Sequence, residues 1–496
     1  MHIQEYGEAY FDVIIANKGE TAAVTVEYTR DNTDSVFDGG TVTVGAHSTK
    51  TVRIKENLPK GGYIVSVKVS CGDDIAEATK RMTVLESYKS RFMEEYTRVG
   101  IHAKWPEPSV ASSAYKRSRD NMDYGQRLLN ITGFKIARYG TGLSWSHLEK
   151  EEGKLTWEDL PSIDRAVYNG ATSFLAPSYT HNVYGLMNSR EARSKMEQYF
   201  KNRLADGRPN IKFWAELGNE PDLAKYWANR DIYGIQYMDY VREASLVIND
   251  NTRDFSVMGG TVSGGTDAAP MLHYMFAQDA YKYLDAFSYH PYMQSSTVDL
   301  KYDSFTKNYE NSADGKGGWI QKAITEIGWN SAWVATATIP EHSGKNGEIT
   351  KTYLKTYLHD LDLTCWYALS EKQLGICVEG NYDDATACLP VVCQITKMLN
   401  GTLYAGEFPI ADGAQCAMFV RDGKPLMAVW MPGDKPITYT FDTDVHVEDM
   451  SGNPLGDTKT VEIDDDVYWI SGFGKNYIYK TACSVMNGAY DSIEEK

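Results

Sequence analysis

Two glutamates stand in short motifs that can carry out acid–base chemistry together. Glu220 lies in Leu-Gly-Asn-Glu-Pro (217–221), and Glu326 lies in Thr-Glu-Ile-Gly-Trp (325–329). Each follows a mainly apolar run of a kind that predicts a buried β-strand. A protonated carboxyl group can donate to a leaving oxygen while an ionised carboxylate attacks an anomeric carbon. Such a pair therefore suits the cleavage of a glycosidic bond.

The elements that must position these glutamates lie between residues 89 and 400, where short apolar runs alternate with amphipathic helical patterns. Eight βα units in this length favour a closed (β/α)₈ barrel. A doubly wound sheet is the alternative, but no Gly-x-Gly-x-x-Gly follows the first strand. The predicted strands are 98–105, 135–142, 171–179, 211–220, 254–262, 284–292, 322–330 and 363–370.

In such a barrel the reactive groups come from the carboxyl ends of the strands. Glu220 ends the fourth predicted strand and Glu326 the seventh, so both are expected at one edge of the barrel. A single glutamate at a strand end can equally pair with a lysine or arginine in a surface loop. Two of them, with Asn219 and Pro221 around the first, favour a reactive site.

The flanking segments read as antiparallel β-structure, because apolar and polar residues alternate and turn residues separate the runs. Residues 1–88 predict an N-terminal β-sandwich of immunoglobulin-like type. Residues 401–486 predict a C-terminal β-sandwich, and residues 487–496 a polar tail. The predicted fold is therefore an α/β barrel between two antiparallel β-sandwich domains.

The two motifs resemble those of a known superfamily. Gly-Asn-Glu-Pro resembles the acid/base motif of the clan A glycoside hydrolases, and Thr-Glu-Ile-Gly-Trp resembles their nucleophile strand. The resemblance covers residues 89–400, and the flanks look like the accessory domains of families 39, 30 and 79. It implies a retaining hydrolase with Glu220 as general acid/base and Glu326 as nucleophile. It also implies that Asn219 binds the sugar 2-hydroxyl.

Further site residues follow from the same resemblance. Arg138 stands where the clan has an arginine that keeps the nucleophile ionised, although a salt bridge to Glu216 is the alternative. His290 and Tyr292 end the sixth strand, where the clan has a group bonded to the nucleophile. Trp366 on the eighth strand resembles the aromatic floor beneath the sugar. Other aromatic and polar residues at the same rim suggest a carbohydrate cleft, among them Trp105, His181 and Trp329.

Composition narrows the function classes. Lysine and arginine number 50 against 67 aspartates and glutamates, a net charge of −17 that disfavours nucleic-acid binding. No apolar run is long enough for a membrane span. The seven cysteines include no Cys-x-x-Cys pair, and no His-Glu-x-x-His, P-loop or Gly-x-Ser-x-Gly occurs. We therefore expect no metal and no cofactor, and an oligo- or polysaccharide as the partner.

Two other functions compete with a glycosidase. A non-catalytic carbohydrate-binding or cell-surface protein on the same scaffold would not need both glutamates. A lyase or aldolase would need a Schiff-base lysine or a metal cluster at the strand ends, and Lys322 begins its strand at the opposite end. Accessory β-domains favour export, whereas unpaired cysteines and the lack of a signal-like start favour the cytoplasm. The sugar, the linkage, exo or endo action and the oligomeric state are not predicted.

Overall fold

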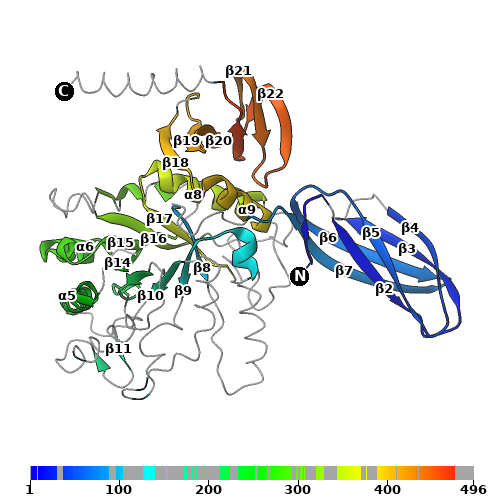
Figure 1. Cartoon of the computed structure of the whole chain (residues 1–496), viewed down its shortest axis with the longest axis horizontal. Helices are drawn as coiled ribbons and strands as arrows, with labels where there is room; N and C mark the ends of the chain where they lie inside the picture. The colour runs from blue at the N-terminus through cyan, green and yellow to red at the C-terminus, as the bar shows by residue number, and fades with distance from the viewer. Residues whose placement is uncertain are drawn as a thin grey trace.

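The structure is a computed structural model of the whole chain. Besides a few shorter pieces, it describes residues 2–30 except 8, 37–88, 97–103, 127–139, 172–175, 213–223, 233–251, 255–264, 268–292, 320–328, 343–369, and 388–474 except 409 and 434. Within these residues three parts can be seen (Figure 1): a central barrel, a β-structure at its N-terminal side and a β-sheet at its C-terminal side.

Eight parallel strands form the central part. They pair in a closed ring in the order β10-β13-β14-β15-β16-β17-β8-β9. Each predicted barrel strand coincides with one of them, which confirms the α/β class and the parallel strands. Their bounds are β8 Val99–Ala103, β9 Ile136–Tyr139, β10 Thr172–Leu175, β13 Phe213–Glu216, β14 Phe255–Ser263, β15 Ala286–His290, β16 Gln321–Ile327 and β17 Leu363–Tyr367.

Alternation along these strands separates an interior from an exterior face. Ala286, Ala323 and Cys365 form a small cluster inside the barrel. The next residues along the strands, such as Phe287 and Ile324, join a much larger core shared with the surrounding helices. The helices that surround the barrel include α5 Tyr233–Asn251, α6 Ala268–Ala277, the 3₁₀ turn η2 Ala280–Lys282, α8 Ser343–Leu358 and α9 Cys388–Leu399.

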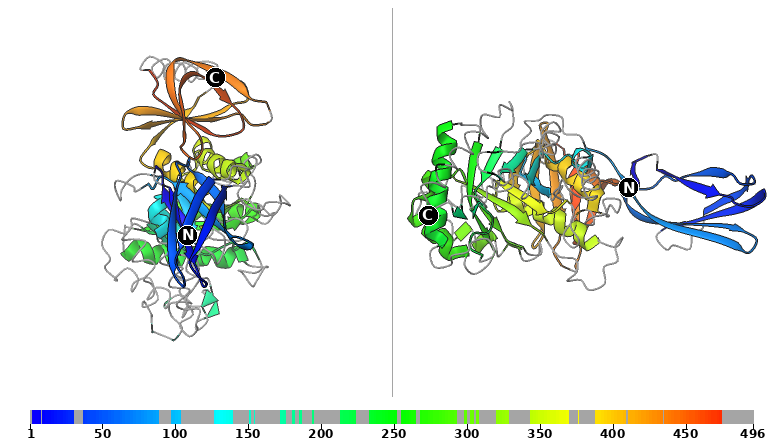
Figure 2. Two further views of the ribbon diagram at one scale, coloured as in Figure 1. Left: turned by 90° about the vertical axis from the view of Figure 1, so that its right-hand side faces the viewer. Right: turned by 90° about the horizontal axis from the view of Figure 1, so that it is seen from below.

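The N-terminal part has two sheets around one core. A five-stranded sheet has the order β1-β7-β6-β3-β4, and β2 pairs with β5 in a second sheet. Buried residues from both sheets, such as Ile15, Ile54 and Val65, belong to one cluster. The strands are β1 His2–Glu5, β2 Tyr10–Ala16, β3 Ala22–Arg30, β4 Phe37–Val44, β5 Thr49–Lys55, β6 Gly61–Cys71 and β7 Asp74–Leu85. This part projects away from the barrel (Figure 2).

The C-terminal part is a single six-stranded sheet, so the expected pair of sheets is not confirmed there. The order is β18-β19-β20-β23-β21-β22. The long strand β21 pairs with β22 on one side and with β23 on the other, so hydrogen bonding continues where a sandwich would divide. The strands are β18 Leu403–Glu407, β19 Gln415–Arg421, β20 Lys424–Trp430, β21 Ile437–Glu448, β22 Pro454–Ile463 and β23 Tyr468–Ser471.

The three parts meet beside α9, which packs against β6 and β7. Lys60 is buried there, and its Nζ donates to Glu86 Oε2 at 2.9 Å and to the Gly452 carbonyl at 2.6 Å. The backbone N–H of Lys60 donates to Asn453 Oδ1 at 2.7 Å, and Asn453 Nδ2 donates back to the Lys60 carbonyl at 3.0 Å. Lys397 on α9 donates to the same Glu86 oxygen. This junction connects both flanking parts to the barrel.

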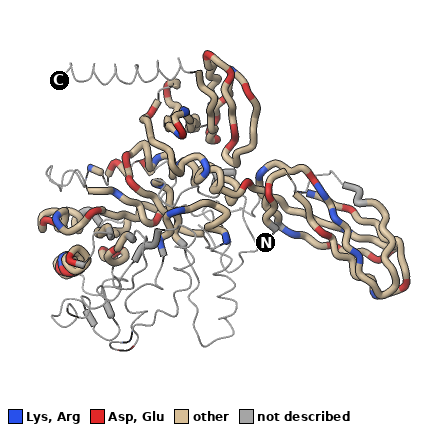
Figure 3. The backbone as a smooth tube through the Cα atoms, viewed as in Figure 1, with Lys and Arg blue, Asp and Glu red and all other residues tan. Residues whose placement is uncertain are grey.

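Charged residues of both signs are interspersed along all three parts (Figure 3). No helix in the described part of the chain is both long and apolar enough to cross a membrane.

Candidate active site

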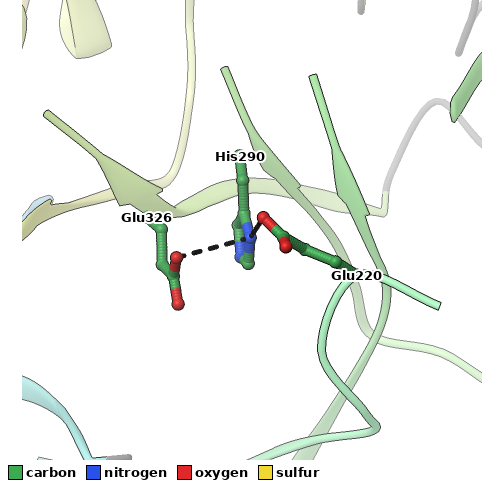
Figure 4. Close-up of side chains that lie close together, drawn as sticks. All are labelled: Glu220, His290 and Glu326. Carbon is green, nitrogen blue, oxygen red and sulfur yellow. Dashed lines mark hydrogen bonds and ion pairs between the residues drawn. The ribbon is translucent and has the colours of Figure 1, made fainter. Parts of the chain in front are cut away.

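The carboxyl ends of several barrel strands bring charged side chains together inside the barrel. Arg138 comes from β9, Glu216 from β13, His290 from β15 and Glu326 from β16. Glu220 follows β13, and its carboxyl group points towards His290 and Glu326 (Figure 4). All five residues are at most 9% exposed. The site therefore concentrates ionisable groups away from bulk water.

Two side chains donate hydrogen bonds to Glu326, and a histidine lies close by. Arg138 Nη1 donates to Oε1, and the Tyr292 hydroxyl donates to Oε2 at 2.6 Å. His102 Nε2 on β8 lies 3.7 Å from Oε1. A shift in the β16–β17 register between Ile324 and Ile327 accompanies this arrangement and interrupts simple alternation along β16.

These contacts fix the charge of Glu326. Burial is the largest single influence and would raise its pKa, and the positive charge of Arg138 is the largest influence that opposes burial. His290, His102 and the Tyr292 hydroxyl act in the same direction, so the pKa of Glu326 lies well below its ordinary value. Burial and the neighbouring carboxylate in turn raise the pKa of Tyr292, which keeps its hydroxyl a donor. Glu326 is thus an ionised carboxylate in a buried site.

Arg138 connects three acceptors. Its Nε donates to Glu216 Oε2 at 2.5 Å, and its Nη2 donates to Asn219 Oδ1 at 2.9 Å, besides the bond to Glu326. The salt bridge to Glu216 and the contact with Glu326 are therefore present together rather than as alternatives. Because Oδ1 of Asn219 accepts from Arg138, the NH₂ group of that amide is directed elsewhere.

Glu220 lies in a turn after β13 and is 7% exposed. Its φ is +43°, in the left-handed region that a non-glycine residue rarely adopts. Its N–H donates to the Thr261 carbonyl at 2.8 Å, and its carbonyl accepts from the Leu223 N–H at 2.9 Å. The turn directs the carboxyl group to His290, whose Nδ1 lies 3.1 Å from Glu220 Oε1.

His290 lies between the two glutamates. Its Nδ1 is 3.7 Å from Glu326 Oε2, and its Nε2 is 2.9 Å from Thr325 Oγ1. If Thr325 donates to Nε2, then Nδ1–H donates to an ionised Glu220. If Nε2–H donates to Thr325, then Nδ1 accepts from a protonated Glu220. The geometry therefore suits both protonation states of Glu220.

One oxygen of Glu220 and one of Glu326 lie within 4.8 Å of each other, with a nitrogen of His290 in the same range. Two carboxylates and an imidazole are also donors that a metal ion can use. Glu326, however, already binds the Arg138 cation and the Tyr292 hydroxyl. We assign no metal to this group, because a second cation there would face the charge of Arg138.

Two aromatic residues end β17, and Tyr367 rather than Trp366 faces the site. Trp366 is 1% exposed and belongs to the core shared with the helices. Thr364 bonds Thr356 of α8, so alternation directs Trp366 to the same outer side. Tyr367 instead contacts the His102 ring at 4.7 Å and the Tyr292 ring at 6.1 Å between centroids. The packing of Trp366 therefore does not support the expectation that it forms the aromatic floor of the site.

Three expected rim residues add nothing to the geometry. Trp105 and Trp329 lie outside the described residues, and for His181 only the backbone position in β11 (Thr180–His181) is described. The sequence-based assignment also lacked Thr325 as a partner of His290, and it did not give His102 a specific role. The parity of β8 places His102 on the face opposite to the buried Ile101, a signal present in the sequence.

Comparison with known proteins gives a likeness of fold. No family model matches the sequence, and no curated protein matches it. A family 39 glycoside hydrolase from the gut symbiont Bacteroides cellulosilyticus WH2 is similar in structure, with a TM-score of 0.70 and 16% identity over 95% of this chain and 98% of that one.

Two further solved structures are similar over most of the chain. A family 39 β-xylosidase from Caulobacter crescentus has a TM-score of 0.54 and 13% identity over 76% of this chain and 95% of that one. A family 30 endoxylanase from Clostridium papyrosolvens C71 has a TM-score of 0.53 and 14% identity over 79% and 98%. The resemblance to families 39 and 30 of clan A inferred from the motifs is thus confirmed as a likeness of fold.

Proposed function

We propose that this chain is a retaining glycoside hydrolase that cleaves an O-glycosidic bond by double displacement. The observation that supports it best is the pair of buried carboxyl groups of Glu220 and Glu326, with oxygens within 4.8 Å of each other. Retaining enzymes have carboxyl groups about 5–5.5 Å apart, whereas inverting enzymes need about 6.5–9.5 Å to admit a water. The likeness of fold to glycoside hydrolases supports the same assignment.

In the first step, Glu326 attacks the anomeric carbon and Glu220 gives its proton to the glycosidic oxygen. The surroundings of Glu326 suit attack, because Arg138 keeps it ionised and Tyr292 orients it. Glycosylation of Glu326 removes its negative charge, and Arg138 keeps its ion pair with Glu216. The guanidinium therefore has a charge partner in both states of the nucleophile.

In the second step, Glu220 acts as a base and takes a proton from water, which attacks the glycosyl-enzyme. His290 can follow this change by moving its own proton between Nδ1 and Nε2, with Thr325 as the partner on the far side. The NH₂ group of Asn219 is available for a sugar hydroxyl, since its oxygen accepts from Arg138. Trp105, His181 and Trp329 remain proposals for the outer sugar-binding rim.

We further propose that residues 1–88 and 401–486 are accessory units of this enzyme. A non-catalytic sugar-binding protein would not require a carboxylate held ionised beside a second buried carboxyl group, so the structure favours the enzyme. Incubation with a panel of aryl glycosides, beginning with β-xylosides, tests the proposal. Release of the aryl group by the wild type, its loss in Glu326→Gln, and a first-formed sugar of retained configuration by NMR are expected. An inverted product would contradict double displacement.

A further inference from the structure

The turn that carries Glu220 leaves regular strand geometry together with the neighbouring strand. Gly218 and Glu220 have φ values of +89° and +43°, and Gly260 and Thr261 on β14 have +84° and +40°. The β14–β15 register shifts between Gly259 and Val262, at the same level of the barrel. The turn after β13 and this part of β14 therefore lack the regular hydrogen bonds between neighbouring strands, so other contacts must hold them in place.

Two of these contacts lie before Glu220 in the chain. The hydroxyl of Tyr237 on α5 donates to the Leu217 carbonyl at 2.6 Å and accepts from the Gly260 N–H at 3.0 Å. The Leu217 N–H donates to the Met258 carbonyl at 2.8 Å. These hydrogen bonds hold the chain before Glu220 against β14 and α5.

A third contact lies after Glu220. The side chain of Asp222 is fully buried, and its Oδ1 accepts from the Ser263 N–H at 2.9 Å. Its Oδ2 accepts from the Ser263 hydroxyl at 2.6 Å. Ser263 on β14 pairs with His290 on β15. Asp222 therefore connects the turn that carries Glu220 to β14, the strand next to His290. Glu220 is therefore clamped from both sides.

The hydrogen bonds of Asp222 can be separated from its other properties. An asparagine can keep the same shape, with its oxygen accepting from the Ser263 N–H and its NH₂ donating to the Ser263 hydroxyl. An alanine at this position would remove both acceptors from Ser263. Asparagine and alanine therefore distinguish a clamp that works through these two bonds from one that does not.

We propose that Asp222 is a positioning residue that anchors the Glu220 turn to β14 and so keeps the Glu220 carboxyl group beside His290 and within reach of the glycosidic oxygen. The inference rests on the proposed role of Glu220 as general acid/base.

The test compares Asp222→Ala with Asp222→Asn on aryl glycosides of graded leaving-group ability. Asp222→Ala removes both acceptors of the clamp, so kcat/KM should fall most for poor leaving groups, where protonation by Glu220 matters most. Asp222→Asn keeps both hydrogen bonds to Ser263 and should restore the wild-type dependence on the leaving group. Ser263→Ala loses only the hydroxyl bond and should lie between the two.

A second readout does not need turnover. A crystal structure of Asp222→Ala should show the Glu220 carboxyl group displaced from His290 Nδ1, and one of Asp222→Asn should show it in place. An unmoved Glu220 carboxyl group in Asp222→Ala, or an equal loss of rate for good and poor leaving groups, would overturn the inference. A wild type that cleaves no glycoside but whose Glu220 carboxyl group moves in Asp222→Ala would overturn the proposed function and leave the anchoring role of Asp222 supported.

Discussion

Arg138 on β9 donates a hydrogen bond to Glu326 on β16 inside the barrel, and the same guanidinium holds Glu216. One buried cation thus serves two buried carboxylates, one of which we assign to the chemistry and one to support. This arrangement separates the roles of the carboxylates by position. Glu216 also lies within 3.4 Å of the Ser288 hydroxyl, which donates to its other oxygen.

The first prediction concerns the acid limb of activity. Burial raises the pKa of Glu326, but Arg138, His290, His102 and Tyr292 together outweigh burial, and Arg138 contributes most among them. The nucleophile therefore stays ionised below the ordinary carboxyl range. In the double variant Arg138→Met/Glu216→Gln the cation is gone and burial dominates, so the pKa of Glu326 should rise. The acid limb of kcat/KM should then move to higher pH, as measured with an activated aryl glycoside.

Glu216→Gln alone is the matched control for that experiment. It keeps Arg138, and the acid limb should stay near its wild-type position. Because the native pKa of Glu326 is lowered, its ionisation contributes stability that is present above the unfolded pKa and lost as pH falls through the folded one. The midpoint of acid unfolding should therefore lie at higher pH in the double variant than in Glu216→Gln. An acid limb at the same pH in all three proteins would contradict the assigned role of Arg138.

A second prediction concerns Tyr292. Tyr292→Phe removes the donor to Glu326 Oε2 but keeps the ring contact with Tyr367. A hydrogen bond to a charged group contributes about 1.5–3 kcal/mol, so kcat/KM should fall about 10- to 100-fold. The loss should be similar for good and poor leaving groups, since Tyr292 acts on the nucleophile. Tyr289→Phe, which changes a residue of β15 that packs in the core shared with the helices, should keep wild-type rates. Equal losses in both variants would contradict the role of Tyr292.

The barrel could be predicted because its strands are buried on both faces and read as short apolar runs between helical patterns. Each of the eight expected runs overlaps an observed strand, from β8 at Val99–Ala103 to β17 at Leu363–Tyr367, although β14 and β16 each extend one residue beyond the expected run. Strand-end position then brought Glu220 and Glu326 to one edge. Pattern and topology alone were sufficient for that much.

The predictions that the structure does not support depend on which face of a strand a residue occupies and on how far a strand continues. Trp366 was assigned to the site by residue type, but the outward contact of Thr364 with α8 sets the parity of β17 and places Tyr367 inside. The expected C-terminal sandwich is not confirmed, because β21 is one long strand that pairs with both β22 and β23 and has a register shift between Thr440 and Val445. Local sequence does not specify such shifts, because they depend on the partner strand.

A third prediction concerns the junction beside α9. Lys60→Met removes a buried cation and leaves the Gly452 carbonyl without that donor. An unsatisfied buried acceptor costs about 1–3 kcal/mol, so the N-terminal part should become easier to detach. Limited proteolysis between residues 85 and 100 should accelerate, and thermal unfolding should separate into two steps.

Lys397→Met is the control for the junction. Lys397 bonds the same Glu86 oxygen but is more exposed than Lys60, and such surface pairs contribute about 0–1 kcal/mol. Burial opposes the two lysines at Glu86, but together they lower its pKa, so the clamp should hold above the unfolded pKa and weaken as pH falls through the folded one. Equal effects of the two lysine variants would show that burial of Lys60 is not what secures the junction.

The last prediction separates the roles of Glu326 and Glu220. Glu326→Ala should lose turnover on every substrate, because no other group at the site is placed to form the glycosyl-enzyme. Azide should then restore some activity by attacking from the vacated side, with an inverted product. Glu220→Ala should slow poor leaving groups by about 10²–10⁴-fold and spare the first step on activated aryl glycosides. Azide should there intercept the glycosyl-enzyme and give a product of retained configuration. NMR of the two azide products decides the matter: the opposite pairing would exchange the two roles, and full activity in both variants would place the site elsewhere.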